Sequence, residues 1–260
     1  MVSALLDEGF YVTMDLGLRG KSVLVTGGSK GIGFACARSF VAEGCRVHLA
    51  ARDGARLEQA RAELKGEVAI HACDLRDAQA LQALATACAQ VDILVNNAGD
   101  IPGGTLESVD EAKWRHAWEL KVFGYVNLTR ALFAGMRQRK SGVIVNVIGM
   151  AGENPSFEYI CGSTANAGLA AFTKALGKGS VEHGVRVLGV HPPSTRTDRI
   201  LGVMKAAAKA KFGDESRYPE LAASGTFGRM IEPEQVGDTV AFLASARAGQ
   251  LSGVVLNLGS

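Results

Sequence analysis

Short runs rich in β-branched residues alternate with longer amphipathic stretches along most of this 260-residue chain. An apolar run of about 4–8 residues suits a buried strand, and apolar residues recurring every three or four positions suit a helix that covers a sheet. The predicted strands are Lys21–Thr26, Arg46–Ala51, Glu67–Ala72, Asp92–Asn96, Val143–Ile148, Val185–His191 and Gly253–Leu258. The predicted helices are Ile32–Glu43, Ala55–Leu64, Ala78–Ala89, Asp110–Arg139, Tyr159–Glu182 and Pro233–Ala244.

This alternation predicts an α/β fold, a Rossmann-like, doubly wound, seven-stranded parallel sheet with helices on both faces. We expect residues 16–260 to form a single Rossmann-type domain. Residues 192–230 contain no predicted strand and one helical stretch, Asp198–Phe212, so we expect a substrate loop or lid there. Residues 1–15 are interpreted as an N-terminal extension, or as the result of a misassigned start codon, because Met14 resembles a natural start.

Charge and hydropathy argue against several classes of function. Lys and Arg number 28 and Asp and Glu number 26, so the net charge is +2. This is too little for a protein that binds nucleic acid or a membrane surface through bulk charge. No apolar stretch approaches the roughly 18 residues that a membrane span needs, and the first residues do not resemble a signal peptide. We therefore expect a cytoplasmic protein without nucleic-acid or membrane partners.

The cysteines and histidines give no signal for a metal site. The cysteines are odd in number and show no Cys-x-x-Cys spacing, which favours reduced thiols in the core. His116, His183 and His191 each stand alone, without the spacing of metal ligands, and no metal is expected. The five cysteines are Cys36, Cys45, Cys73, Cys88 and Cys161.

A glycine-rich segment, Thr26-Gly27-Gly28-Ser29-Lys30-Gly31-Ile32-Gly33, connects the first predicted strand to an amphipathic helix. Glycines permit a tight turn and let backbone N–H groups approach a pyrophosphate, whose charge the helix N-terminus favours. The agreement of strand, spacing and helix predicts a dinucleotide-binding loop. The residues expected to bind the cofactor here are Gly27, Ser29, Lys30, Gly31, Ile32 and Gly33.

The end of the second predicted strand distinguishes between the two nicotinamide cofactors. It reads Ala51-Arg52-Asp53, without an acidic residue at its tip to accept the ribose hydroxyls of NAD. Arg52 and Lys30 are two cations that we expect to converge on the 2′-phosphate of NADP. The sequence therefore predicts NADP(H), with solvated surface charges as the alternative interpretation of both residues.

Further motifs follow the third, fourth and sixth predicted strands: Asp74-Leu75, Asn96-Asn97-Ala98-Gly99, and Pro192-Pro193 with Thr197. Together with the glycine loop, they resemble the short-chain dehydrogenase/reductase family over residues 16–258. The resemblance implies that Asp74 and Leu75 lie at the adenine and that Asn97, Ala98 and Gly99 line the adenosine ribose. It also implies that Pro192 and Thr197 lie at the nicotinamide, although Pro193 replaces the family's glycine and would stiffen the turn.

Members of this family transfer hydride between nicotinamide and a carbonyl carbon with an Asn, a Ser, a Tyr and a Lys. When the fifth strand and the helix after it are aligned with the family, the serine position falls on Gly149 and the tyrosine position on Gly162. The lysine position falls on Asn166 and the asparagine position on Lys121. The resemblance thus implies a divergent member that lacks this tetrad.

Three residues are candidates for a replacement. Lys121 and Asn166 exchange the family's amide and ammonium groups, and Tyr159 lies three residues before Gly162, about 4.5 Å along a helix. Our hypothesis is that Tyr159 donates a proton, Lys121 lowers its pKa, and Asn166 orients water or substrate. The alternative is that Tyr159 only packs at the helix start, Lys121 reaches solvent and Asn166 has no chemical role.

Three functions remain open. The leading hypothesis is an atypical NADP(H)-dependent oxidoreductase that acts on a small carbonyl, imine or hydroxyl substrate. The alternatives are a catalytically silent NADP-binding sensor or partner protein, and a non-redox enzyme on the same scaffold. The resemblance also implies a homo-oligomer, either a dimer or a tetramer.

Overall fold

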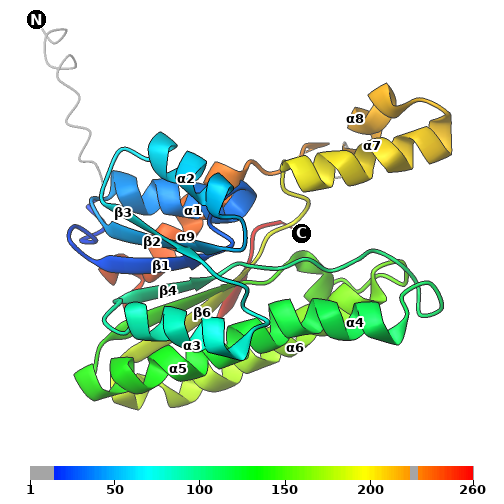
Figure 1. Ribbon diagram of the computed structural model, residues 1–260. Helices are drawn as coiled ribbons and strands as arrows, with labels where there is room; N and C mark the ends of the chain where they lie inside the picture. Colours follow the sequence, from blue (N-terminus) through cyan, green and yellow to red (C-terminus); the bar gives the residue numbers. More distant parts are fainter. Residues whose placement is uncertain (1–14, 223–227, 260) are drawn as a thin grey trace, which may run out of the picture.

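The computed structural model describes residues 15–222 and 228–259. Its sheet has seven parallel strands in the order β3-β2-β1-β4-β5-β6-β7 (Figure 1). The predicted fold is therefore confirmed, and each strand overlaps its predicted range. The strands are β1 Ser22–Thr26, β2 Arg46–Ala51, β3 Val68–Ala72, β4 Ile93–Asn96, β5 Gly142–Val147, β6 Val185–His191 and β7 Val255–Asn257.

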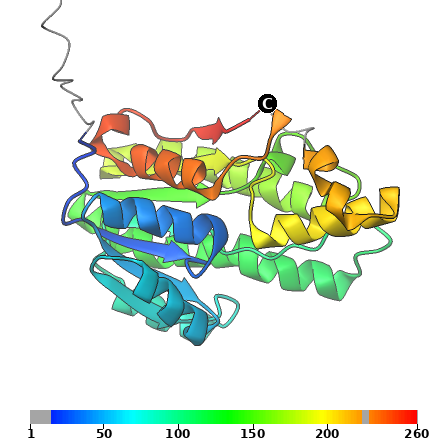
Figure 2. The same ribbon diagram turned by 90° about the horizontal axis from the view of Figure 1, so that it is seen from above.

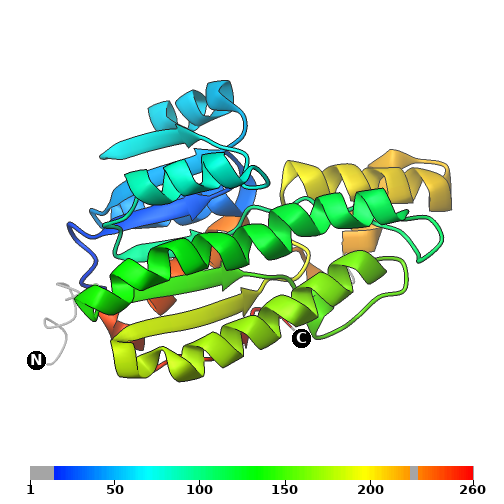
Figure 3. The ribbon, with the colours of Figure 1, turned by 60° about the horizontal axis from the view of Figure 1, so that its bottom comes forward.

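Helices cover both faces of the sheet. The alternation of side chains along β1 shows the division, because Val23 and Val25 pack in one apolar cluster and Leu24 in another. Helices α1, α2 and α9 lie over the first face (Figure 2), and α3, α5 and α6 lie over the second (Figure 3). The α-helices are α1 Gly31–Ala42, α2 Gly54–Glu63, α3 Ala78–Ala87, α4 Glu111–Trp118, α5 Gly124–Arg139, α6 Ile160–Gly179, α7 Asp198–Phe212, α8 Tyr218–Ala222 and α9 Pro233–Ala244.

Two helices differ from their predicted ranges in ways that affect the site. The helix predicted over Asp110–Arg139 is divided into α4 and α5 by a π-helical turn, η1 (Glu119–Phe123). The helix predicted to begin at Tyr159 begins at Ile160, and Tyr159 is its N-cap residue. Both differences lie where apolar periodicity continues while the backbone hydrogen-bonding pattern changes, so periodicity alone does not detect them.

The strand order reverses between β1 and β4, which opens a crevice at the carboxyl ends of these strands. Helices α7 and α8 stand apart from the two helical layers at that end of the molecule (Figures 1 and 2). They belong to the predicted lid, residues 192–230, of which residues 223–227 lie outside the described part. Residues 1–14 of the predicted extension also lie outside it.

The cysteines are all free and buried. Among the described residues, no helix combines the length and the apolar character needed to cross a membrane.

Candidate active site

The glycine loop forms a narrow backbone cradle at the end of β1. Gly27 and Gly31 have φ angles of +65° and +57°, which residues with a side chain rarely adopt. A Cβ at Gly33 would lie 2.3 Å from the Gly27 carbonyl oxygen, so only glycine permits this approach of α1 to the loop. Lys30 is the N-cap of α1 and makes no side-chain capping bond, which leaves the amides of the first turn available to an anion.

Hydrogen bonds connect the motif after β4 to the end of β1. The hydroxyl of Thr26 accepts hydrogen bonds from the backbone N–H groups of Asn97 (2.9 Å) and Ala98 (3.1 Å). The Asn97 side-chain amide donates to the Thr26 carbonyl at 3.0 Å. A Cβ at Gly99 would lie 2.9 Å from Cδ of Lys121, so this glycine makes room for the lysine side chain. The motif thus connects the glycine loop to the region around Lys121.

The lid begins directly against the glycine loop. Thr197 is the N-cap of α7, where its hydroxyl accepts from the Ile200 amide, and its Cγ2 lies 3.2 Å from where a Cβ of Gly31 would be. The Pro192 carbonyl accepts a hydrogen bond from the backbone N–H of Met150 at 3.0 Å. The structure therefore brings Thr197 and Pro192 from the sixth strand's end to the crevice.

At the other end of the crevice, three charged side chains gather after β2 and β3. Asp74 is held by Arg76 through an ion pair of 2.5 Å and a second hydrogen bond of 2.9 Å. These hydrogen bonds to Arg76 are the main reason that the pKa of Asp74 is lowered, and the positive charge of Arg52 contributes to the shift. Arg52 and Lys30 are exposed and Leu75 is buried. Sequence reasoning missed Arg76, which only its contact with Asp74 reveals.

The Tyr159 ring occupies the space beside Gly162. A Cβ at Gly162 would lie 2.1 Å from Cε1 and from Cζ of the Tyr159 ring, so this ring and any side chain at position 162 exclude each other. The ring packs against the small apolar cluster that contains Ile101 and Ala165. Although Tyr159 precedes the helix, its ring therefore folds over the first turn of α6, beside Gly162, the residue that aligns with the family's tyrosine.

The cation beside this phenol comes from the lid. Burial raises the pKa of Tyr159, and the charge of Arg199 together with a hydrogen bond to it offsets part of the shift. Arg199 also donates to the Ile101 carbonyl at 2.5 Å and lies 3.7 Å from a carboxylate oxygen of Asp100. This differs from the hypothesis that Lys121 lowers the Tyr159 pKa. Sequence reasoning missed Arg199 because only the folded lid brings the first turn of α7 to α6.

Lys121 lies in the π-helical turn and points to the end of β5. Its Nζ donates to the Ile148 carbonyl at 2.6 Å. Burial, helped by repulsion from Arg199, lowers the pKa of Lys121 to about 8. The side chain is partly buried and does not extend into solvent.

Asn166 is buried behind Gly149. Its side chain is 3% exposed, and its Oδ1 has no hydrogen-bond partner within the described residues. Its Nδ2 lies 2.9 Å from where a Cβ of Gly149 would be, and Gly149 has a φ of +129°. The Asn166 amide thus fills the space that a side chain at position 149 would need. Because a buried oxygen without a partner is energetically costly, the Oδ1 of Asn166 favours a hydrogen-bond donor beside it.

These interactions link Tyr159, Arg199, Lys121 and Asn166, a group of side chains that we call the wall of the site. Tyr159 meets Arg199, Arg199 acts on Lys121, and Lys121 binds the residue next to Gly149, against which Asn166 packs. The wall offers a phenol, two cations and an amide. Such a set can hold and protonate the oxygen of a carbonyl group.

Known proteins share both the sequence and the fold. A family model described as short chain dehydrogenase matches residues 21–206. Acetoacetyl-CoA reductase of Rhizobium meliloti is 32% identical over 239 residues, which cover 90% of this chain and 95% of that protein.

Two solved structures extend the likeness to three dimensions. L-sorbose reductase from Gluconobacter frateurii, in complex with NADPH and L-sorbose, has a TM-score of 0.88 and 30% identity, covering 95% of this chain and 97% of that one. A variant of actinorhodin polyketide ketoreductase with NADPH has a TM-score of 0.88 and 29% identity, covering 92% and 96%. Both are complexes with the cofactor that the sequence predicts. The matched residues span more than half of the chain, which therefore belongs to the short chain dehydrogenase family.

Proposed function

We propose that this chain is an NADP(H)-dependent reductase of a small carbonyl or imine compound, with Tyr159 as the proton donor. The observation that carries the proposal is the Tyr159 ring against Gly162, beside Arg199 and on the wall that carries Lys121. A phenol beside cations can supply the proton that carbonyl reduction requires. The similarity to an acetoacetyl-CoA reductase, an L-sorbose reductase and a polyketide ketoreductase supports the same reaction class.

The cofactor half of the proposal rests on the cradle of glycines. Gly27, Gly31 and Gly33 leave space that side chains would fill, and α1 begins without a side-chain cap, which suits a pyrophosphate. Arg52 and Lys30 would bind the 2′-phosphate, because both are exposed cations and the tip of β2 holds Ala51 in place of an acid. When bound, NADPH supplies the hydride that reduces the substrate carbon.

Tyr159 would give its phenolic proton to the substrate oxygen or nitrogen as the carbon is reduced. The alkoxide formed is a much stronger base than a phenolate, so the transfer is favourable even though burial raises the Tyr159 pKa. A protonated phenol can act as the acid in carbonyl reduction, and the raised pKa of Tyr159 favours that form.

The neighbouring groups would orient the reacting atom. The ammonium of Lys121 and the guanidinium of Arg199 would stabilise negative charge on the substrate oxygen, and Arg199 would polarise the phenol. The unpaired Oδ1 of Asn166 would accept a hydrogen bond from a substrate hydroxyl or a bound water. These roles replace the single relay through Lys121 that the sequence suggested.

A substrate panel with two matched variants tests this function. NADPH absorbance is followed with small aldehydes, ketones, keto esters and imines. With a substrate found, Tyr159→Phe is expected to lower kcat by about 10²-fold or more, because the proton donor is lost. Tyr218→Phe, which removes a phenolic hydroxyl from α8, is expected to retain the wild-type rate.

Three outcomes contradict the proposal in different ways. Equal rates for Tyr159→Phe and wild type would remove Tyr159 from the chemistry. An inactive panel with a protein that binds NADPH would favour the sensor, and an inactive protein that ignores NADPH would favour the non-redox alternative.

A further inference from the structure

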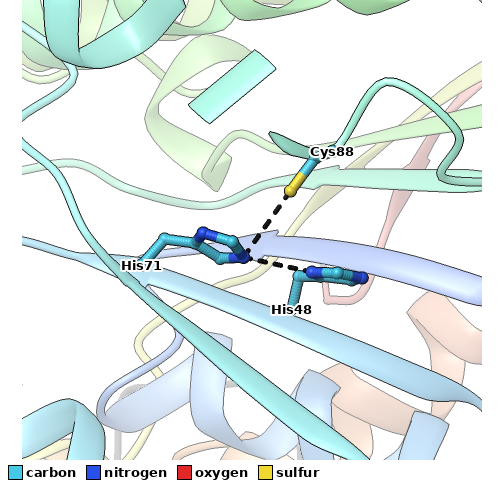
Figure 4. Close-up of side chains that lie close together, drawn as sticks. All are labelled: His48, His71 and Cys88. Carbon is cyan, nitrogen blue, oxygen red and sulfur yellow. Dashed lines mark hydrogen bonds between the residues drawn. The ribbon is translucent and has the colours of Figure 1, made fainter. Parts of the chain in front are cut away.

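Three side chains with metal-binding atoms meet on the sheet face covered by α3. His48 lies on β2, His71 on the neighbouring β3, and Cys88 is the C-cap residue of α3 (Figure 4). Nδ1 of His48 lies 3.1 Å from Nε2 of His71, and that Nε2 lies 3.7 Å from the Cys88 sulfur. All three atoms lie within 4.8 Å of one another.

These separations suit a single small ion. Zinc binds imidazole nitrogen at about 2.0–2.1 Å and thiolate sulfur at about 2.3 Å in tetrahedral geometry, so its ligand atoms lie roughly 3.3–3.7 Å apart. The distance of 3.1 Å between the two imidazole nitrogens lies just below that range, and the distance of 3.7 Å from His71 to the Cys88 sulfur lies at its upper end. Two imidazoles and one thiolate also form a donor set that zinc prefers over calcium or magnesium.

The register of the sheet makes the arrangement stable without metal. His71 pairs with Ala50 and His48 pairs with Ala69, so both imidazoles point to the same face of the sheet from adjacent strands. The rings stack with their centroids 5.3 Å apart. The ligands are thus held by backbone pairing before any ion arrives, which lowers the entropic cost of binding it.

Burial shifts the pKa values of all three side chains. It lowers the pKa of both His48 and His71. Around His48, the charge of Arg46 opposes a cation and that of Glu67 favours one. Burial raises the pKa of Cys88 to about 11, so metal binding must displace the thiol proton.

Two further features favour a cation here. Cys88 ends α3, where the helix dipole places partial negative charge. Both histidines are only partly buried, which leaves solvent access for a water molecule as a fourth ligand.

We propose that His48, His71 and Cys88 bind one Zn²⁺ ion, with water in the fourth position, as a cross-link between β2, β3 and the end of α3. The site is separate from the wall of Tyr159, Lys121 and Asn166. It contains none of the residues assigned to the cofactor. The proposal is therefore independent of the reaction that this chain catalyses.

Cobalt titration of the metal-free, full-length protein tests the site. Co²⁺ is the probe because a cobalt–thiolate bond gives a near-ultraviolet charge-transfer band, and Zn²⁺ is then added as competitor. We expect the band to saturate at one Co²⁺ per chain and to disappear on addition of Zn²⁺. Zn²⁺ is also expected to raise the Tm of the wild-type protein, since it binds the folded state.

Two cysteine variants identify the ligand. Cys88→Ser is expected to abolish the charge-transfer band and to weaken Co²⁺ binding about tenfold or more. Cys36→Ser is the matched control, because Cys36 is 0% and Cys88 1% exposed and Cys36 lies in the cluster on the opposite face. The control is expected to keep the wild-type band.

His71→Gln gives a second test if Cys88→Ser does not fold, and it should shift the cobalt spectrum and weaken binding similarly. The proposal fails if wild-type protein shows no thiolate band with excess Co²⁺, which would leave a hydrogen-bonded cluster only. It also fails if the band survives in a folded Cys88→Ser variant.

Discussion

At position 162 the absence of a side chain determines where a neighbouring ring lies. The Tyr159 phenyl carbons take the place of any Cβ at this position, so the glycine and the tyrosine act together. Spacing alone suggested that the phenol had room to lean in. The structure adds that the ring closes over the first turn of α6, which follows from the non-helical backbone of an N-cap residue.

This geometry predicts the effect of one added methyl group. Gly162→Ala should displace the Tyr159 ring, because the new Cβ would lie 2.1 Å from ring carbons, and should lower kcat by about tenfold or more. Gly168→Ala, in the same helix with open space at its Cβ, should keep the wild-type rate and stabilise the protein by about 0.5–1 kcal/mol. Steady-state kinetics and urea unfolding measure both effects. Equal kinetics for the two variants would show that the ring position has no influence on turnover.

Lys121 predicts a pH dependence of stability. Its pKa is lowered from 10.5 to about 8 in the folded protein, so between these values the unfolded chain binds more protons than the folded one. The free energy of unfolding should therefore rise with pH across this window, by up to roughly 3 kcal/mol, and this contribution should be lost as pH falls through 8.

Other groups also titrate in this pH window. The contribution of Lys121 to the pH dependence of stability is therefore isolated by comparison with the Lys121→Met variant. The free energy of unfolding of the wild type minus that of the variant, measured with urea from pH 7 to 11, should become more positive toward alkaline pH. Parallel curves for the two proteins would contradict the lowered pKa.

Among the elements, the π-helical turn matters most for the site. Apolar periodicity predicted one helix over Asp110–Arg139, and its total extent is close to that of α4, η1 and α5 together. The turn inserts extra residues per revolution and so changes the direction of the side chains in it. Lys121 consequently reaches the Ile148 carbonyl at the end of β5. A hydrophobic pattern does not encode this direction, because the polar face of the helix is continuous.

The lid shows a second property that the hydrophobic pattern does not predict. Its helix was predicted at Asp198–Phe212 with the observed bounds, yet no sequence pattern pointed to Arg199 as a neighbour of Tyr159. A cation in the first turn of an exposed helix resembles any solvated charge. Arg199 lies in the first turn of α7, whose N-cap residue Thr197 has its Cγ2 3.2 Å from where a Cβ of Gly31 would be, so this turn begins close to the glycine loop.

For the whole molecule, cofactor binding connects the two sides of the strand-order reversal and should stabilise the complete fold. NADPH is expected to raise the Tm by several degrees more than NADH at equal concentration, because only NADPH offers a 2′-phosphate to Arg52 and Lys30. Arg52→Ala should reduce the difference between the Tm increases that NADPH and NADH cause. Arg38 is an exposed arginine on α1 that pairs with Glu234. Arg38→Ala is therefore the control, and it should leave the difference between the two Tm increases unchanged. Equal shifts for NADPH and NADH would contradict the cofactor assignment.

The sequence by itself determined the order of strands and helices, the dinucleotide cradle and the positions of the unusual residues Gly149, Gly162, Lys121 and Asn166. These are local properties, since propensity, period and glycine spacing act over a few neighbouring residues. Only the tertiary structure decided that Arg199 lies beside Tyr159, that Arg76 holds Asp74, and that His48, His71 and Cys88 meet. Such contacts depend on strand register and on packing between elements far apart in the chain, which no local pattern records.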